Sequence, residues 1–158
     1  MRALKYPALL AFFGMSAIAA PAPGTGEAGA MQNRSITLCV EGGKSFTAVL
    51  EDNSSAKALV KLLEKSDISI KMRDYANMEK VGPLGYELPR NDEQTTTSCG
   101  DLILYQGNQF VIYYAPNSWC FTRLGKIENA DAKELKSALG EGDVTVIISK
   151  TKNGSSRL

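Results

Sequence analysis

Residues 100–127 read GDLILYQGNQFVIYYAPNSWCFTRLGKI, with three apolar runs separated by two turn signals. Gly107-Asn108 is a two-residue hairpin signal, because glycine readily adopts the positive φ that such turns require. Pro116-Asn117 marks the second turn. The stretch therefore predicts a three-stranded antiparallel meander.

The two turns also predict the register of this meander. Tyr105 is expected to face Phe110, and Tyr114 to face Trp119. One side of the sheet then carries the aromatic residues Tyr105, Phe110, Tyr114, Trp119 and Phe121, and the other carries Leu102, Leu104, Val111, Tyr113, Cys120 and Leu124. Because both sides are apolar, both must be covered, which predicts a mainly β fold with a barrel or sandwich wall. The aromatic cluster is expected in the core, or around an apolar cavity if the interior is not filled.

The sequence before this stretch adds three strands and a helix. Alternating apolar residues predict strands at residues 35–40, 45–50 and 68–75, the first two joined at Gly42-Gly43. A helix is expected after the N-cap candidates Asn53-Ser54-Ser55. Its apolar face follows helical spacing through Ala56, Leu59, Val60 and Leu63.

The sequence after it adds a second short helix and a closing strand. Asp131 with Glu134 three residues later resembles a capping box, and Gly140 ends the helix. Residues 143–149 alternate as the last strand.

Residues 76–98 show no clear periodicity and include Gly82-Pro83, Gly85 and Pro89. A segment of this length without regular structure is uncommon in a compact domain and is often a binding loop. We therefore expect the function to lie next to this segment.

The composition excludes several classes of function. Eighteen basic and seventeen acidic residues give a net charge of +1, which does not favour nucleic-acid binding. The chain has no histidine, which removes the commonest general base and transition-metal ligand. Three cysteines without CxxC spacing do not replace it, so neither a metal nor a cofactor is predicted.

The first 34 residues differ from the rest. Arg2 and Lys5 precede an apolar run, and Ala17-Ile18-Ala19 fits the cleavage pattern of a secretory signal. We interpret residues 1–20 as a signal peptide, 21–34 as a flexible linker, 35–150 as the folded domain and 151–158 as a polar tail. The protein is thus expected to be exported, periplasmic or secreted, with no membrane span in the mature chain. An uncleaved anchor and a cytosolic form starting at Met31 are the alternatives.

The three cysteines allow two interpretations. In an oxidising compartment one pair among Cys39, Cys99 and Cys120 could form a disulfide, with three possible pairings. Free buried thiols are the alternative, because unpaired cysteine behaves as a small apolar residue.

Several short motifs carry a family resemblance. They are Arg73-Asp74-Tyr75, Glu79-Lys80, Leu88-Pro89, the strand from Gly100 to Tyr105, and Leu124-Gly125-Lys126-Ile127. Together with the order of elements, they are similar to the small prokaryotic cyclophilin-like domain family. The resemblance covers about residues 35–150 and implies a single cyclophilin-like β-barrel closed by one or two short helices, with a biochemical role that is poorly defined.

The resemblance does not transfer the prolyl isomerase activity of true cyclophilins. Their active surface combines an arginine in a Phe-x-Arg-type strand with phenylalanines, a glutamine, a tryptophan and a histidine. This chain has no histidine and no Phe-x-Arg-Ile-type segment, and Trp119 directly follows a turn in a different hairpin. No catalytic residue is therefore assigned.

The candidate ligand-binding residues are Arg73, Tyr75, Glu79, Arg90, Tyr113 and Tyr114. Arg73 could orient a carboxylate or a peptide carbonyl, or it could pair with a carboxylate that holds the adjoining loop. Asp101 and Arg123 could act as polar anchors or lie at the barrel rim.

The sequence favours a binding module for a small molecule or peptide over an enzyme. A weak or atypical peptidyl-prolyl isomerase with Arg73 or Arg90 as donor is the alternative, and a structural domain in an envelope complex is a third possibility. The oligomeric state is not predicted.

Overall fold

The computed structural model describes residues 34–152. Its elements in chain order are β1 (Ser35–Val40), β2 (Ser45–Leu50), α2 (Ser54–Leu63), β3 (Ile68–Tyr75), β4 (Glu79–Pro83), β5 (Glu93–Thr96), β6 (Asp101–Tyr105), β7 (Gln109–Tyr113), β8 (Ser118–Ile127), α3 (Ala132–Leu139) and β9 (Val144–Lys150). The predicted signal peptide, nearly all of the linker and most of the tail lie outside the described residues.

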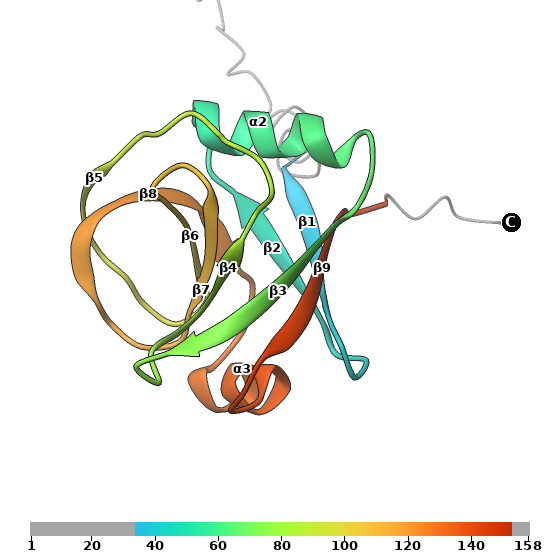
Figure 1. Ribbon diagram of the computed structural model, residues 1–158, viewed down its shortest axis with the longest axis vertical. Coiled ribbons are helices and arrows are strands. Elements are labelled where there is room, and N and C mark those ends of the chain that lie inside the picture. Colours follow the sequence, from blue (N-terminus) through green and yellow to red (C-terminus); the bar gives the residue numbers. More distant parts are fainter. Residues whose placement is uncertain (1–33, 153–158) are drawn as a thin grey trace, which may run out of the picture.

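The described strands form one antiparallel sheet in the order β2-β1-β9-β3-β4-β7-β6-β8-β5. The C-terminal part of β8 also pairs with β2, which closes eight of these strands into a barrel and leaves β5 as an addition at the edge of β8. Figure 1 shows α2 and α3 at opposite ends of this barrel. The mainly β, barrel fold is therefore confirmed.

The first hairpin forms as its alternation predicts. Leu38 on β1 lies opposite Phe46 on β2, and both side chains are buried. Gly42 and Gly43 have φ values of 108° and 105°, which a residue with a Cβ rarely adopts.

Both helices begin at the predicted caps. The Asn53 side chain accepts a hydrogen bond from the Ala56 amide at 2.8 Å, and the Asp131 side chain accepts one from the Glu134 amide at 2.7 Å. Gly140, with φ of 71°, follows the end of α3. Neither helix in residues 34–152 has the length and apolar character needed to cross a membrane.

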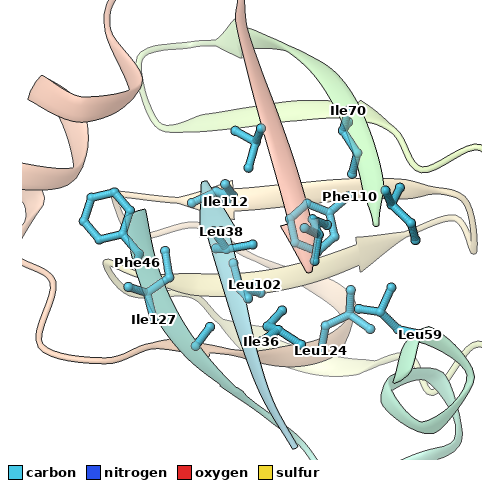
Figure 2. Close-up of a cluster of buried hydrophobic side chains, with 14 of the residues drawn as sticks. Ile36, Leu38, Phe46, Leu59, Ile70, Leu102, Phe110, Ile112, Leu124 and Ile127 are labelled. Carbon is cyan, nitrogen blue, oxygen red and sulfur yellow. The ribbon is translucent and has the colours of Figure 1, made fainter. Parts of the chain in front are cut away.

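The barrel interior is filled by apolar side chains. Alternate residues of the strands point inward, and Figure 2 shows them meeting between the strands and α2. Members of this cluster include Ile36, Leu38, Phe46, Leu59, Ile70, Leu102, Phe110, Ile112, Leu124 and Ile127. The apolar residues on the inner face of the sheet therefore pack against one another as a core rather than around an interior cavity.

The predicted register of the β6–β7 hairpin is wrong by one residue. Gln106 and Gly107 both have positive φ, and the turn contains three residues between the strands, so Tyr105 faces Gln109 rather than Phe110. Because successive residues of a strand point to opposite faces, the single-residue shift separates the predicted aromatic cluster. Phe110 and Tyr114 belong to the interior cluster, whereas Phe121 belongs to a second cluster described below.

The predicted meander is also wrong in its third strand. β8 pairs with β6 and β2, and the chain between β7 and β8 crosses over β6 rather than folding directly back along β7. The crossing segment is held by other partners, since the Ala115 amide donates to the Met78 carbonyl and the Thr97 amide donates to the Asn117 carbonyl. The turn signal at Pro116-Asn117 therefore predicted that the chain reverses there, but not that the next strand, β8, pairs with β6 instead of β7.

Residues 76–98 are not the irregular loop that the sequence suggested. They contain β4, which lies between β3 and β7, and β5, which pairs with the first half of β8. Gly82 explains part of the broken pattern, because a Cβ there would lie 2.4 Å from the Lys71 carbonyl oxygen. Close approach of two strands therefore requires glycine at a position where alternation would suggest a larger residue.

Candidate functional site

The outer face of the barrel carries a second, smaller apolar cluster. It is formed by side chains that point away from the interior, namely Ile103, Val111, Tyr113 and Phe121, with Val81 packed against them. Strand pairing places these side chains in rows, because Val81 lies opposite Val111, and Val111 lies opposite Ile103. Apolar side chains on the outer wall are stabilised when they are shielded from water, and the first half of β8 shields part of this cluster.

The cover comes from a bend in β8. Leu102 pairs with Gly125 whereas Ile103 pairs with Arg123, so β8 has one extra residue at a bulge. Its first half then pairs with β5, and Figure 1 shows it curving away as the wide orange ribbon. Phe121 packs on Tyr113 with ring centroids 5.7 Å apart and on Tyr105 at 6.4 Å.

Between this bend and strands β3, β4 and β7 lies an open pocket of about 640 Å³. Its base is formed by Val81, Val111, Tyr113 and Phe121, and its rim by Arg73, Tyr75, Tyr105, Gln109 and Trp119. The side chains of Tyr75 and Trp119 are strongly exposed, at 57% and 62%. A concave surface with an apolar base and a few polar groups is typical of ligand sites.

Glu79 is the acidic group of the pocket. It lies between Tyr75 on β3 and Tyr113 on β7 in the pairing of the strands, and only 8% of it is exposed. Its Oε2 atom is shielded from solvent and accepts no hydrogen bond within the described residues. Burial raises the pKa of Glu79, the neighbouring Tyr113 hydroxyl opposes the rise, and the charge of Asp74 adds to it.

Tyr113 supplies the hydroxyl beside this carboxyl. The hydroxyl accepts a hydrogen bond from Nδ2 of Asn117 at 3.2 Å, which ties the crossing segment to β7. Burial and the Glu79 carboxyl raise the pKa of Tyr113, so the phenol stays protonated and available as a donor.

Arg73 provides the basic group at the rim. It lies opposite Val81, which is two residues after Glu79 on β4, and it is exposed. Among residues 34–152, Arg73 forms no ion pair with a carboxylate, so the predicted pair that would hold the loop is not formed. Its guanidinium is therefore open to a ligand.

The structure brings together four of the six residues chosen from the sequence. Arg73, Tyr75, Glu79 and Tyr113 line the pocket, whereas Arg90 lies on the loop before β5 and pairs with Asp92. Tyr114 points to the other side of the sheet, where its hydroxyl donates to Asp74. Adjacent residues of a strand face opposite ways, so Tyr113 and Tyr114 lie on opposite sides of the sheet and only Tyr113 lines the pocket.

Tyr114 instead belongs to a polar network at the end of the barrel near α3. Asp74 also accepts a hydrogen bond from the Asn77 amide at 3.0 Å and lies 3.4 Å from Nζ of Lys80. The Lys80 side chain is fully buried and donates to the Gly142 carbonyl at 2.6 Å. This network holds the β3–β4 turn against the loop between α3 and β9.

Asp101 and Arg123 have structural partners. Phe121-Thr122-Arg123 has Phe-x-Arg spacing, although leucine rather than isoleucine follows it. The Arg123 guanidinium lies 3.2 Å from the buried Asp101 carboxylate and donates to the Thr96 carbonyl. Lys126 adds a second cation 3.4 Å from Asp101. These contacts fix the start of β6 to β8 and β5, and neither Asp101 nor Arg123 lines the pocket.

Sequence reasoning missed several pocket residues. Val81, Gln109, Val111 and Asn117 were not proposed, and Tyr105, Trp119 and Phe121 were assigned to a cluster in the core or around an interior cavity. In β4 the inner positions are the charged Lys80 and the small Gly82, so apolar alternation gave no signal for the outer face formed by Glu79, Val81 and Pro83.

The pocket offers no obvious means of holding a metal ion. Within the described part of the chain, no group of three or more histidine, cysteine, aspartate or glutamate residues could bind one. Cys39, Cys99 and Cys120 are free thiols, and of these only Cys120 is exposed.

Comparisons with known proteins agree with this architecture. No curated protein matches the chain. The solution structure of a hypothetical protein from Archaeoglobus fulgidus is similar, with a TM-score of 0.55 and 10% sequence identity, over 75% of this chain and 95% of that one. At this identity the similarity shows the fold alone. Residues 40–149 match the cyclophilin-like family, and the chain therefore belongs to that family.

Proposed function

We propose that this domain binds a small molecule or an exposed peptide side chain in the outer-wall pocket, without catalysing a reaction. One observation carries the proposal. The large apolar side chains exposed among residues 34–152 are Tyr75, Tyr86, Tyr105, Trp119 and Ile147, and three of these five line the same pocket. Exposed apolar side chains that gather around a concave surface are typical of a binding site.

Trp119 allows a direct test, because it is the single tryptophan of the chain and lies at the rim. Small aromatic compounds and short peptides should be titrated into the full chain while Trp119 fluorescence and backbone amide NMR shifts are followed. We expect saturable changes centred on β4, β7 and the first half of β8. Changes confined to another face, or none at all, would contradict the proposal.

Tyr75 and Tyr86 form a matched pair for this test. Both are exposed tyrosines, at 57% and 45%, but only Tyr75 lines the pocket. Tyr75→Ala should weaken binding roughly 3- to 10-fold, the loss expected for one aromatic contact, and Tyr86→Ala should leave it unchanged. Equal effects of the two changes would place the ligand elsewhere.

Prolyl isomerisation is the second candidate function, and the open guanidinium of Arg73 beside an apolar pocket favours it. Isomerisation requires a proline slot and a polarising donor held together. The assay is the isomerisation of X-Pro peptides, and Arg73→Ala should abolish any rate above background. Arg90→Ala is the control, since Arg90 pairs with Asp92 outside the pocket. If the folded chain does not accelerate X-Pro isomerisation, the isomerase candidate fails and the binding function remains.

Export is proposed from the sequence pattern of residues 1–20. The intact mass of the protein recovered from its native host is the test. A mature chain that starts after Ala19 or Ala20 is expected, and a chain that retains its first twenty residues would contradict processing.

A further inference from the structure

We infer that the ligand of the outer-wall pocket carries a protonated amine on an aromatic or aliphatic body, and that Glu79 binds this amine. The inference rests on the proposed function and adds the chemical class of the ligand. It follows from the surroundings of Glu79, from the aromatic walls and from the distribution of charge around the pocket.

The carboxyl group of Glu79 lacks the partners that a buried acid normally has. Its Oε2 atom is buried without a hydrogen bond, and no lysine or arginine among residues 34–152 pairs with it. The Tyr113 hydroxyl beside it is neutral and supplies no counter-charge. A buried carboxylate without a counter-ion is costly, and Glu79 lines the pocket, so a cationic group in the pocket would supply the missing counter-charge.

The walls beside Glu79 are suited to a cation. Tyr75 and Tyr113 flank it on the two neighbouring strands, and Trp119 of β8 lies at the rim of the pocket. Aromatic faces attract ammonium groups through the negative charge above each ring, and the attraction increases when water is excluded. The same rings provide the apolar surface for the body of the ligand.

Two charged residues of β3, Arg73 and Asp74, lie near Glu79. Arg73 on β3 is exposed at the rim, where solvent screens it, and would repel a second cation. Asp74, also on β3, strengthens the negative field, although its carboxylate is paired with Tyr114 and Lys80. The other titratable groups that line the pocket are the phenols of Tyr75, Tyr105 and Tyr113. Lys80, next to Glu79 on β4, points to the opposite face, where it pairs with Asp74 and the Gly142 carbonyl.

A pair of matched probes tests the inference on the full chain. The amine 2-phenylethylamine and the neutral alcohol 2-phenylethanol have similar size and shape, and amide NMR shifts measure both affinities. At neutral to mildly alkaline pH the amine should bind about tenfold more tightly, as expected for one charge-assisted hydrogen bond. Its advantage should fall as the pH is lowered and Glu79 becomes protonated.

Two variants make the test specific. Glu79→Gln keeps the shape of the side chain and should remove the preference for the amine and its pH dependence, while the alcohol binds as before. Glu128→Gln, an exposed glutamate outside the pocket, should change neither affinity. If amine and alcohol bind equally and Glu79→Gln has no effect, the amine inference fails and the binding pocket stands. If neither probe binds, both proposals fail.

Discussion

At the scale of single residues, Glu79 links the stability of the domain to pH. Its pKa in the folded chain is raised above the usual 4.5, so the folded state holds this proton more firmly than the unfolded state. The stabilising contribution is therefore complete below the unfolded pKa and is lost as the pH rises through the folded one. Glu79→Gln should remove this loss.

Thermal unfolding of the wild type and of Glu79→Gln between pH 4 and pH 8 is the measurement. The melting temperature of the variant relative to the wild type should rise by roughly 2 to 5 °C over this range, since other titrating groups cancel in the difference. Two parallel curves would show that Glu79 titrates alike in the folded and unfolded chains.

Gly125 gives a prediction about close packing. It lies on β8 where that strand passes between β2 and β6, and a Cβ there would lie 2.3 Å from the Val49 carbonyl oxygen. Gly125→Ala should therefore lower the free energy of unfolding by about 1 to 3 kcal/mol or more. Gly142→Ala is the control, because a Cβ at Gly142 meets nothing within 4 Å and should change stability by less than about 0.5 kcal/mol. Urea denaturation of both variants decides the matter, and equal stabilities would refute a steric role for Gly125.

At the scale of elements, the β6–β7 hairpin shows what local sequence can and cannot predict. Both strands were predicted, because apolar runs flank a glycine turn. The register was not, because Gln106 takes a positive φ that its residue type does not suggest, and the turn gains one residue. The shift of one position changed which β6 side chains share each face, because Ile103 lies with Val111 and Tyr113 on the outer face, whereas Leu102 and Leu104 lie with Phe110 in the interior.

The β3–β4 turn gives a prediction about a buried cation. Asp74 accepts hydrogen bonds from Tyr114 and the Asn77 amide and lies 3.4 Å from the fully buried Lys80 ammonium. Removing this carboxylate leaves Lys80 with the Gly142 carbonyl as its remaining described partner. Asp74→Ala should therefore destabilise the domain by about 2 to 4 kcal/mol.

The pH dependence of this effect has a definite sign. The Tyr114 hydroxyl holds the pKa of Asp74 below its usual 3.8, so the contribution of Asp74 is present at neutral pH and is lost as the pH falls below that value. Urea denaturation at pH 7 and pH 3 should show a smaller cost of Asp74→Ala at the lower pH. Asp67→Ala, at an exposed site, serves as control. A cost that does not depend on pH would argue against a charged Asp74.

At the scale of the whole molecule, the strand order was the part that local patterns could not supply. Closure depends on β8 pairing with both β6 and β2, and these contacts join segments far apart in the sequence. The family resemblance implied a barrel, and turn signals predicted the β1–β2 and β6–β7 pairs, but the other strand neighbours came only from the structure. The outer pocket depends on the same long-range contacts, because Trp119 and Phe121 reach it through the bend in β8.

Closure also predicts which part of the chain is sufficient to fold. The barrel, both capped helices, the interior cluster and the pocket are all formed by residues 34–152. A chain limited to these residues should unfold in one cooperative step within roughly 3 °C of the full chain, and with the same Trp119 emission.

A shorter chain provides the contrast for this experiment. Residues 34–143 lack β9, which pairs with β1 on one side and β3 on the other, so the barrel would lose its closure and buried Val146 and Ile148. This chain should show no cooperative melting transition by circular dichroism. If residues 34–152 also fail to melt cooperatively, the fold needs residues outside this range; if residues 34–143 melt like the full chain, β9 is not required for closure.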